Sequence, residues 1–144
     1  MPNISKSALV THSASEMFAL VDNVASYKEF LPWCGGSEEL SRNEDEVKAS
    51  VMISHSGLNK TFTTLNRLQK NKMIEIKLVD GPFKHLYGFW RFDSLSEDAC
   101  KISLDLEYEF SNMMLAIAIG PVFNHIANSM VDSFCQRAEA VYGK

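Results

Sequence analysis

The sequence predicts an α+β fold: a curved antiparallel sheet of about seven strands wraps around one long C-terminal helix, and two short helices follow the first strand. Three observations predict it. Apolar and polar residues alternate through the middle of the chain, from residue 37 to residue 110. Turn-forming residues interrupt this alternation at the spacing of consecutive hairpins. After residue 112 the apolar residues recur every three or four positions, which is the period of a helix.

The first elements are a strand over residues 4–11 and two short helices. Ser13 and Glu16 form a capping-box pattern directly before an apolar run, which predicts that a helix begins there. Ser26 and Glu29 repeat the pattern and predict a second helix. This helix must end near Pro32, because proline cannot continue the backbone hydrogen bonding of a helix.

Six further strands are expected between residues 37 and 110, with one buried and one solvated face. The clearest alternation runs from Cys100 to Phe110, where each apolar residue is followed by a polar one. Hairpin turns are predicted at Asn43-Glu44-Asp45, Ser56-Gly57-Leu58-Asn59, Gln69-Lys70-Asn71, Gly81-Pro82-Phe83 and Ser96-Glu97-Asp98.

The last segment is predicted to be a long amphipathic helix that lies across the buried face of the sheet. Pro121 interrupts the pattern, so the helix either kinks there or consists of one piece from about Asn112 and a second from Pro121. Its apolar stripe contains Phe123, Ile126, Ala127, Met130, Val131, Phe134, Ala138 and Val141.

Composition indicates one soluble domain, residues 1–144, with a cytoplasmic location. The chain has 144 residues, of which 46% are hydrophobic, and a net charge of −4. Cys34, Cys100 and Cys135 are far apart and lack metal-ligand spacing, which argues against disulfides and against a zinc site. The longest apolar run, residues 113–119, is shorter than the roughly 20 residues of a transmembrane helix, and no secretory signal is visible.

The charge is unevenly distributed. Residues 58–91 contain seven Lys and Arg but two acidic residues, a balance of +5 that leaves −9 for the rest of the chain. If these basic residues converge on neighbouring strands, they form a patch for RNA phosphates, with Tyr87 and Phe89 facing outward to stack on bases. The alternative is a solvated outer sheet face. The candidate contacts are Lys60, Arg67, Lys77, Lys84 and Arg91.

A sheet that grips a single helix leaves unfilled space, which commonly becomes an apolar pocket. We expect the wall to include Phe83, Leu86, Trp90 and Phe92 from one strand and Val122, Ile126, Met130 and Phe134 from the helix, unless these are ordinary core residues. Met113 and Met114, with Met130, are expected to form an adaptable part of this wall.

A loop with two aromatic rings is the candidate lid of this pocket. It contains Phe30, Leu31, Pro32 and Trp33, and Gly35-Gly36 would give it the freedom to open. The alternative is a hydrophobic plug that seals the end of the core.

Catalysis is not predicted. His85, near Asp80 and Tyr87, is the one candidate acid or base, and a solvated histidine at the end of a hairpin is the favoured interpretation. No metal site is predicted, because no metal-binding motif is present.

Several segments resemble the START-like polyketide cyclase and coenzyme-Q-binding family: residues 24–34, 60–64, 78–84, 88–92 and 130–138. The resemblance runs from Pro2 to about Tyr142. It implies a helix-grip fold with a hydrophobic cavity, and in the coenzyme-Q branch the binding of ubiquinone or another isoprenoid lipid. Gly120-Pro121 departs from the ribosome-association toxin branch, in which a basic residue is expected after the glycine.

Two functions follow as predictions. In the toxin branch, the resemblance implies binding to the large (50S) ribosomal subunit, inhibition of subunit association and translation, and an antitoxin partner in a type II toxin–antitoxin system. The alternative is a ubiquinone or isoprenoid carrier that supports respiration, with no further cofactor. The two functions are compatible if a cavity ligand sets the position of the Trp33 loop.

Overall fold

The structure, a computed structural model, describes residues 3–55 and 57–143 of the chain. It has seven strands and three α-helices, and a 3₁₀ turn at Val24–Ser26 separates the first two helices. The elements are β1 (Asn3–Val10), α1 (Ala14–Asp22), α2 (Tyr27–Phe30), β2 (Cys34–Arg42), β3 (Glu46–His55), β4 (Leu58–Gln69), β5 (Met73–Asp80), β6 (Phe83–Ser96), β7 (Ala99–Phe110) and α3 (Met113–Tyr142).

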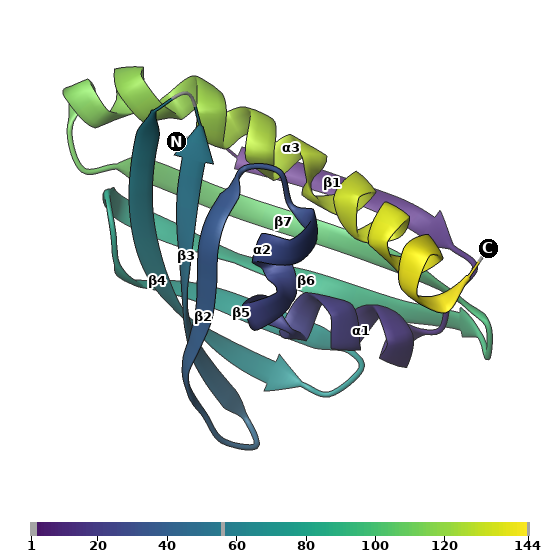
Figure 1. Cartoon of the computed structure of the whole chain (residues 1–144). Helices are drawn as coiled ribbons and strands as arrows, with labels where there is room; N and C mark the ends of the chain where they lie inside the picture. The colour runs from purple at the N-terminus through teal and green to yellow at the C-terminus, as the bar shows by residue number, and fades with distance from the viewer. Residues whose placement is uncertain (1–2, 56, 144) are drawn as a thin grey trace.

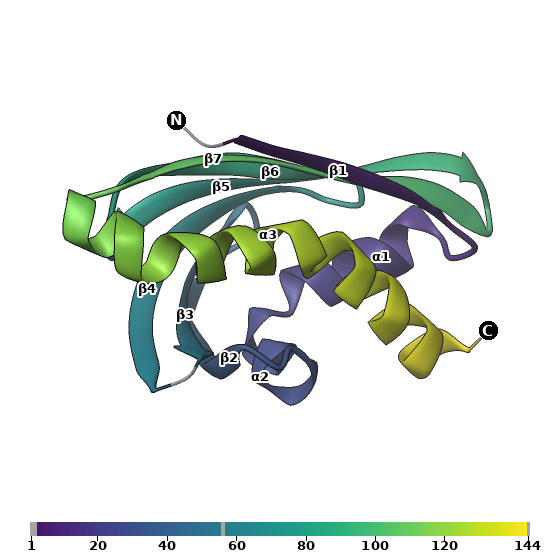
Figure 2. The same ribbon diagram turned by 90° about the horizontal axis from the view of Figure 1, so that it is seen from above.

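The seven strands form one antiparallel sheet in the order β1-β7-β6-β5-β4-β3-β2. The first strand therefore pairs with the last, and the remaining strands follow as consecutive hairpins. The sheet curves, and α3 lies along its concave side, while α1 and α2 cover the end of the sheet away from the start of α3 (Figures 1 and 2). The predicted fold class is confirmed. The first strand begins and ends one residue earlier than expected, and Ser56, in the second predicted turn, lies outside the described residues.

The first of the two predicted capping boxes forms and the second does not. The Glu16 amide donates to Ser13 Oγ (3.1 Å), and the Ser13 amide donates to Glu16 Oε1 (2.9 Å). Ser26 makes no side-chain cap, although α2 does begin after it. Because Ser26 leaves a 3₁₀ turn, its backbone is already helical (φ −89°, ψ −7°), whereas a capping residue needs an extended backbone. Its hydroxyl accepts instead from Asn23 Nδ2 (2.8 Å).

α3 is continuous through Pro121, so the two-piece alternative is wrong. The helix begins at a side-chain cap, in which the Leu115 amide donates to Asn112 Oδ1 (2.9 Å). Pro121 lies on the exposed side of α3, where water can hydrogen-bond the Ile117 carbonyl that the proline leaves without an amide partner. By length and composition α3 could cross a membrane, although it packs along β1 and β7 as a core helix does.

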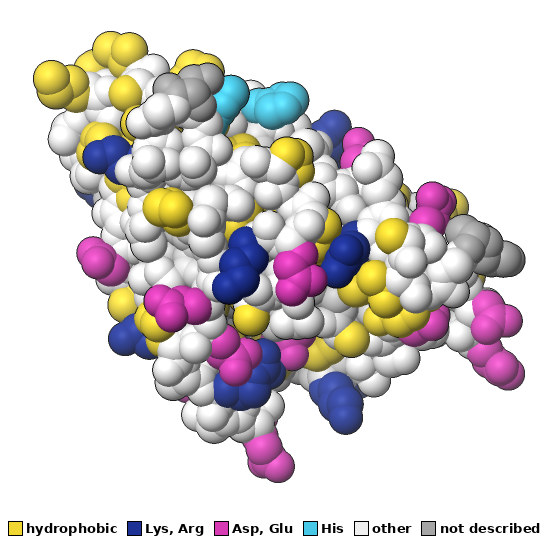
Figure 3. Space-filling view, viewed as in Figure 1, with side chains coloured by type: hydrophobic (Ala, Val, Ile, Leu, Met, Phe, Trp, Pro, Cys, Tyr) yellow, Lys and Arg dark blue, Asp and Glu magenta, His cyan; other side chains and the backbone are white. Residues whose placement is uncertain are grey.

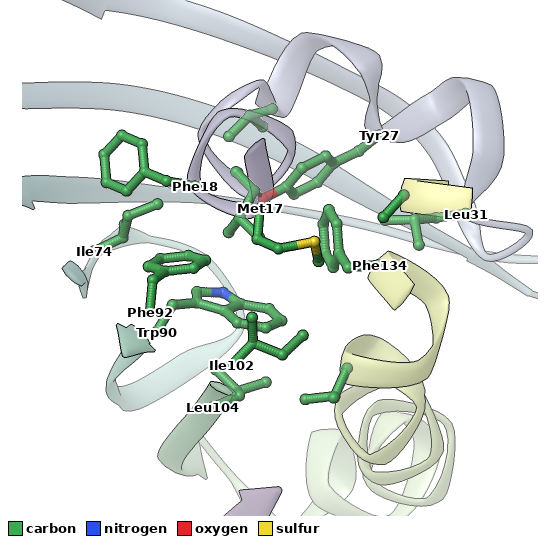
Figure 4. Packing of buried hydrophobic residues seen from close by; sticks show 14 of the residues in the cluster. Met17, Phe18, Tyr27, Leu31, Ile74, Trp90, Phe92, Ile102, Leu104 and Phe134 are labelled. Carbon is green, nitrogen blue, oxygen red and sulfur yellow. Dashed lines mark hydrogen bonds between the residues drawn. The ribbon is translucent and has the colours of Figure 1, made fainter. Parts of the chain in front are cut away.

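The core is divided into two hydrophobic clusters. The first lies beneath α1 and α2 and centres on Phe134, whose ring packs edge-on against Tyr27 and Trp90 with centroids 5.3 Å apart in each pair (Figure 4). The second lies under the start of α3 and centres on Phe123. Three half-buried residues pack against both clusters: Trp33, Phe62 and Met130.

Candidate functional site

A cavity of about 100 Å³ lies where the two core clusters meet. The three residues that pack against both clusters also line it. Its wall carries no charged side chain, and the polar groups of Thr64 and Asn66 are hydrogen-bonded to each other (2.9 Å). The wall consists of Val24, Tyr27, Trp33, Ala49, Val51, Phe62, Thr64, Asn66, Ile76, Leu86, Trp90, Leu104, Leu106, Phe123, Ile126, Ala127 and Met130. Such a space suits an apolar, uncharged molecule.

An open groove of about 520 Å³ lies outside this cavity, between the lid segment, the end of β3 and α3. Trp33 and Ile126 line both spaces, so these two side chains separate the cavity from the groove. Trp33 Nε1 is buried and has no hydrogen-bond partner among the described residues. The other residues of the groove are Pro32, Ser54, His55, Pro121, Val122, His125, Ser129 and Ser133. Histidine side chains are visible side by side on this face of the molecule (Figure 3).

The backbone of the predicted lid is held on both sides. The Cys34 amide donates to the Leu31 carbonyl (3.0 Å), and the Ser54 amide donates to the Trp33 carbonyl (2.7 Å). Gly35 and Gly36 belong to β2 rather than to a loop, so the prediction that they act as a hinge is wrong. A Cβ at Gly35 would lie 2.7 Å from Ser54 Cβ, so the glycine there allows β2 to approach β3. Because this backbone is held, rotation of the Trp33 side chain is the local movement that would widen the connection between the cavity and the groove.

The other lid residues do not line the cavity. Phe30 is the last residue of α2, and its ring packs against Phe134 at 5.4 Å and lies 4.7 Å from the Arg137 guanidinium. Leu31 is buried in the first cluster, and Pro32 is exposed and faces the outer groove. Trp33 is thus the single member of the predicted lid that contacts both spaces.

The predicted wall residues fall into three groups. Leu86, Trp90, Ile126 and Met130 line the cavity, and Val122 lines the outer groove. Phe83, Phe92 and Phe134 are buried core residues outside the wall. Met113 and Met114 are 76% and 79% exposed, so the prediction that they form part of the wall is wrong: they precede the buried stripe of α3 and point away from it.

Eight of the ten strand residues in the wall belong to strands that the sequence did not single out. Phe62, Thr64 and Asn66 from β4 alternate toward the cavity, opposite Ala49 and Val51 of β3. The signal was present in the sequence, because polar residues, Thr64 and Asn66, occupy two successive inward positions of β4. A strand with a fully packed inner face would have large apolar residues there.

Three of the five predicted ribosome contacts share the convex face of the sheet. Arg67 lies opposite Glu75 in the β4–β5 ladder, Lys77 opposite Tyr87 and Arg91 opposite Met73 in the β5–β6 ladder, so their side chains point away from α3. The Arg91 guanidinium lies 5.7 Å from the centre of the Phe89 ring.

The other two predicted contacts lie elsewhere. Lys60 pairs with the buried Ile53 and so belongs to the concave side, near the start of β4. Lys84 lies at an irregularity in β6, with its ammonium 3.8 Å from Glu109.

Acidic residues are interleaved with the basic ones on the convex face. Glu46 Oε2 lies 3.6 Å from Arg67 Nε, and Tyr87 Oη donates to Glu75 Oε2 (2.7 Å). Asp105 and Glu107 of β7 lie opposite Phe89 and Tyr87. The local charge is therefore more balanced than residues 58–91 alone indicate, because β3 and β7 contribute acids from outside that segment.

The histidine considered as an acid or base lies outside the cavity. His85 Nε2 is 3.2 Å from Glu107 Oε1, and both side chains are more than a third exposed. The cavity wall contains no histidine or carboxylate, and no group of three or more metal-binding side chains occurs among the described residues. The cysteines are free thiols, and burial raises the pKa of each, that of Cys100 to about 11.

Residues 10–135 match the family model described as polyketide cyclase / dehydrase and lipid transport. The chain is 50% identical over 144 residues to the ribosome association toxin RatA of Vibrio cholerae, with 100% of both chains covered. It is 48% identical over 142 residues to the persistence and stress-resistance toxin PasT of Escherichia coli, covering 99% of this chain and 90% of that protein. A coenzyme Q-binding protein COQ10 homolog B of Xenopus laevis is 25% identical, covering 97% of this chain and 59% of that protein.

Solved structures confirm the fold. The Zhui aromatase/cyclase from Streptomyces superposes with a TM-score of 0.79 at 14% identity, covering 96% of this chain and 93% of that one. A START superfamily protein from Mycobacterium smegmatis superposes with a TM-score of 0.76 at 20% identity, covering 96% and 98%.

Proposed function

The chain belongs to the polyketide cyclase / dehydrase and lipid transport family, and within it we propose that the protein is a ribosome-directed regulator of the RatA kind. It binds the large ribosomal subunit, hinders association of the two subunits and lowers translation. The observation that carries this proposal is identity of 43–50% over at least 98% of the chain with proteins named ribosome association toxin RatA, from Vibrio cholerae, Escherichia coli and Pseudomonas aeruginosa.

We assign the contact to the convex face, where Arg67, Lys77 and Arg91 are exposed. Basic side chains bind RNA phosphates with an affinity that falls as salt rises, and the Phe89 ring beside Arg91 offers a stacking surface for a base. With three basic side chains on phosphates, the slope of log K against log salt is expected to be about two to three in magnitude. In the same proposal the protein is the toxin of a type II toxin–antitoxin system, so co-expression of its antitoxin restores growth.

Sedimentation through a sucrose gradient tests this proposal. The protein should travel with the large subunit in low salt and reduce the fraction of joined ribosomes. A Lys77→Glu/Arg91→Glu variant should bind less and lower the slope of log K against log salt by about two. Lys28→Glu, an exposed lysine on α2, is the matched control. Wild-type protein that stays at the top of a low-salt gradient, with subunit joining unchanged, would end the proposal.

A second function is supported by the cavity itself. We propose that it holds the tail of ubiquinone or a similar neutral isoprenoid lipid, and that the protein acts as a carrier that supports respiration rather than as an enzyme. The wall is apolar and uncharged and offers no acid or base to a ligand apart from Tyr27, whose hydroxyl donates to the Val21 carbonyl. The cavity of about 100 Å³ is smaller than the roughly 300–1,000 Å³ of most ligand pockets. A lipid tail therefore enters as Trp33 rotates and joins the cavity to the outer groove.

Tryptophan fluorescence tests the second function, because Trp33 and Trp90 both line the cavity. A Trp90→Phe variant reports on Trp33 and a Trp33→Phe variant reports on Trp90. Decylubiquinone should quench both signals with the same apparent affinity. The absence of isoprenoid in an organic extract of purified protein, together with unchanged fluorescence on adding the quinone, would contradict this function.

A further inference from the structure

The first two turns of α3 carry an exposed apolar tip, which we define as Met113, Met114 and Ile117. These side chains are 76%, 79% and 72% exposed. Figure 3, drawn from the side used for Figure 1, shows hydrophobic side chains gathered at the corner of the molecule where α3 begins. Of the most apolar 18-residue stretch of α3, 28% is buried. The helix therefore has apolar surface that the sheet does not cover.

This tip is continuous with the route into the cavity. Pro121 follows Ile117 by one helical turn and lies on the same exposed side of α3. Pro121, Val122 and His125 line the outer groove, which shares Trp33 and Ile126 with the cavity. The exposed side of α3 thus runs from the apolar tip to the groove and ends at the side chains that separate the groove from the cavity.

The chemistry of the tip favours a lipid surface over a protein partner. No Lys, Arg, Asp or Glu occurs from residue 111 to residue 131, so the segment enters hydrocarbon without desolvating a charged side chain. The three side chains expose on the order of 400 Å², about half of the roughly 800 Å² that each partner of a stable protein complex buries. Burial in lipid needs no shape complementarity, because the hydrophobic effect is not directional.

We propose that the apolar tip inserts into a lipid bilayer and places the outer groove at the membrane surface, so that a neutral lipid passes between membrane and cavity past Trp33. This inference rests on the lipid-binding part of the proposed function. Because the inserted segment is uncharged, docking does not depend on anionic lipid or on salt. Ribosome binding through the convex face is expected, in contrast, to weaken as salt rises.

Flotation with vesicles tests the proposal. Wild-type protein should float with pure phosphatidylcholine vesicles to the same extent at 0.05 and at about 0.5 M salt, where the Debye length falls to a few ångströms. The Met113→Ser/Met114→Ser/Ile117→Ser variant should partition at least about tenfold less, because three buried apolar side chains are lost. The matched control is Leu9→Ser/Leu95→Ser, whose leucines are 73% and 59% exposed on β1 and β6, and it should float like the wild type.

Other occupants of the tip give different results. Flotation that requires phosphatidylglycerol and disappears in high salt, or that is equal in the triple-serine variant, overturns the proposal. A self-association seen by sedimentation velocity and lost in the triple-serine variant, with no flotation of the wild type, assigns the tip to a second copy. Loss of ribosome co-sedimentation in that variant, again without flotation, assigns it to the ribosome.

Failure of membrane docking is separable from failure of ligand binding. Decylubiquinone reaches the protein from solution, so the triple-serine variant should retain quenching of Trp33 and Trp90 in the absence of vesicles. If quenching is present and flotation absent, the cavity function stands and the docking proposal fails. If flotation is present and quenching absent, the cavity function fails, and transfer of lipid past Trp33 fails with it.

Discussion

Filling the cavity should stabilise the free protein and abolish its ligand binding. Ala127 is 2% exposed and lines the cavity from α3. Ala127→Leu adds three carbon atoms, worth about 2.4 kcal/mol at about 0.8 kcal/mol per buried methylene. Removal of a void of about 100 Å³ gives about the same value at about 24 cal/mol per Å³. After subtraction of about 0.5–1 kcal/mol for side-chain entropy, the free energy of unfolding should rise by about 1.5 kcal/mol.

Urea unfolding at constant m-value measures this change, and Tm should rise by roughly 3–6 °C. The control is Ala138→Leu, since Ala138 is a fully buried alanine on the same helix that does not line the cavity. Leucine there overpacks the first cluster and should lower the free energy of unfolding by about 1–3 kcal/mol. Equal destabilisation by the two substitutions would refute the cavity, and unchanged quenching by decylubiquinone in Ala127→Leu would place the ligand elsewhere.

Four further substitutions test the local analysis. Ser13→Ala removes a formed helix cap and should lower the free energy of unfolding by about 1 kcal/mol. Ser26→Ala, at a position where no cap forms, should change it by only about a few tenths of a kcal/mol. Equal losses for the two variants in urea titrations would contradict this difference. Burial raises the pKa of Cys100 to about 11, so the unfolded chain loses that proton first. The contribution of Cys100 to stability should be constant below about pH 8.5 and should fall as pH rises towards 11. Cys100→Ala should make this fall shallower, and an identical pH profile would refute the assignment. Gly88→Ala would place a Cβ 2.2 Å from the Asp105 carbonyl oxygen on β7. Because that oxygen belongs to the backbone and cannot rotate away, thermal melting should show a loss of about 3 kcal/mol in the free energy of unfolding. A Tm within about 2 °C of the wild type would argue against the close approach.

Local patterns predicted the elements well, because each strand and helix is specified by its own period. Strands β3, β5 and β7 follow the alternation, whereas β2 is exposed at every residue after Ser37. Helix α3 follows the stripe that contains Phe123 and Phe134. The second capping box failed because its outcome depends on the backbone of the preceding 3₁₀ turn, which places Ser26 in a helical conformation. The residue types alone do not contain that information.

The site was harder to predict, because its wall and its charge come from strands distant in sequence. Trp33 was identified from its place in an aromatic loop, but Phe62 and Asn66 face it through pairing of β3 with β4. The basic block was counted along the chain, whereas the convex face is assembled across it. Glu46 and Glu107 therefore reduce a charge that the count assigned to residues 58–91.

The pairing of the first strand with the last has a consequence for synthesis. β1 is made first, but its partner β7 spans Ala99–Phe110, with Asn3 opposite Glu107. During translation β1 therefore stays without its partner until more than a hundred residues have been made, and α3 closes the concave side later still. Contacts of such long sequence separation fold slowly and leave strand edges exposed meanwhile. A chain truncated before residue 99 would lack the strand that holds its N-terminus and should be degraded or aggregate rather than fold.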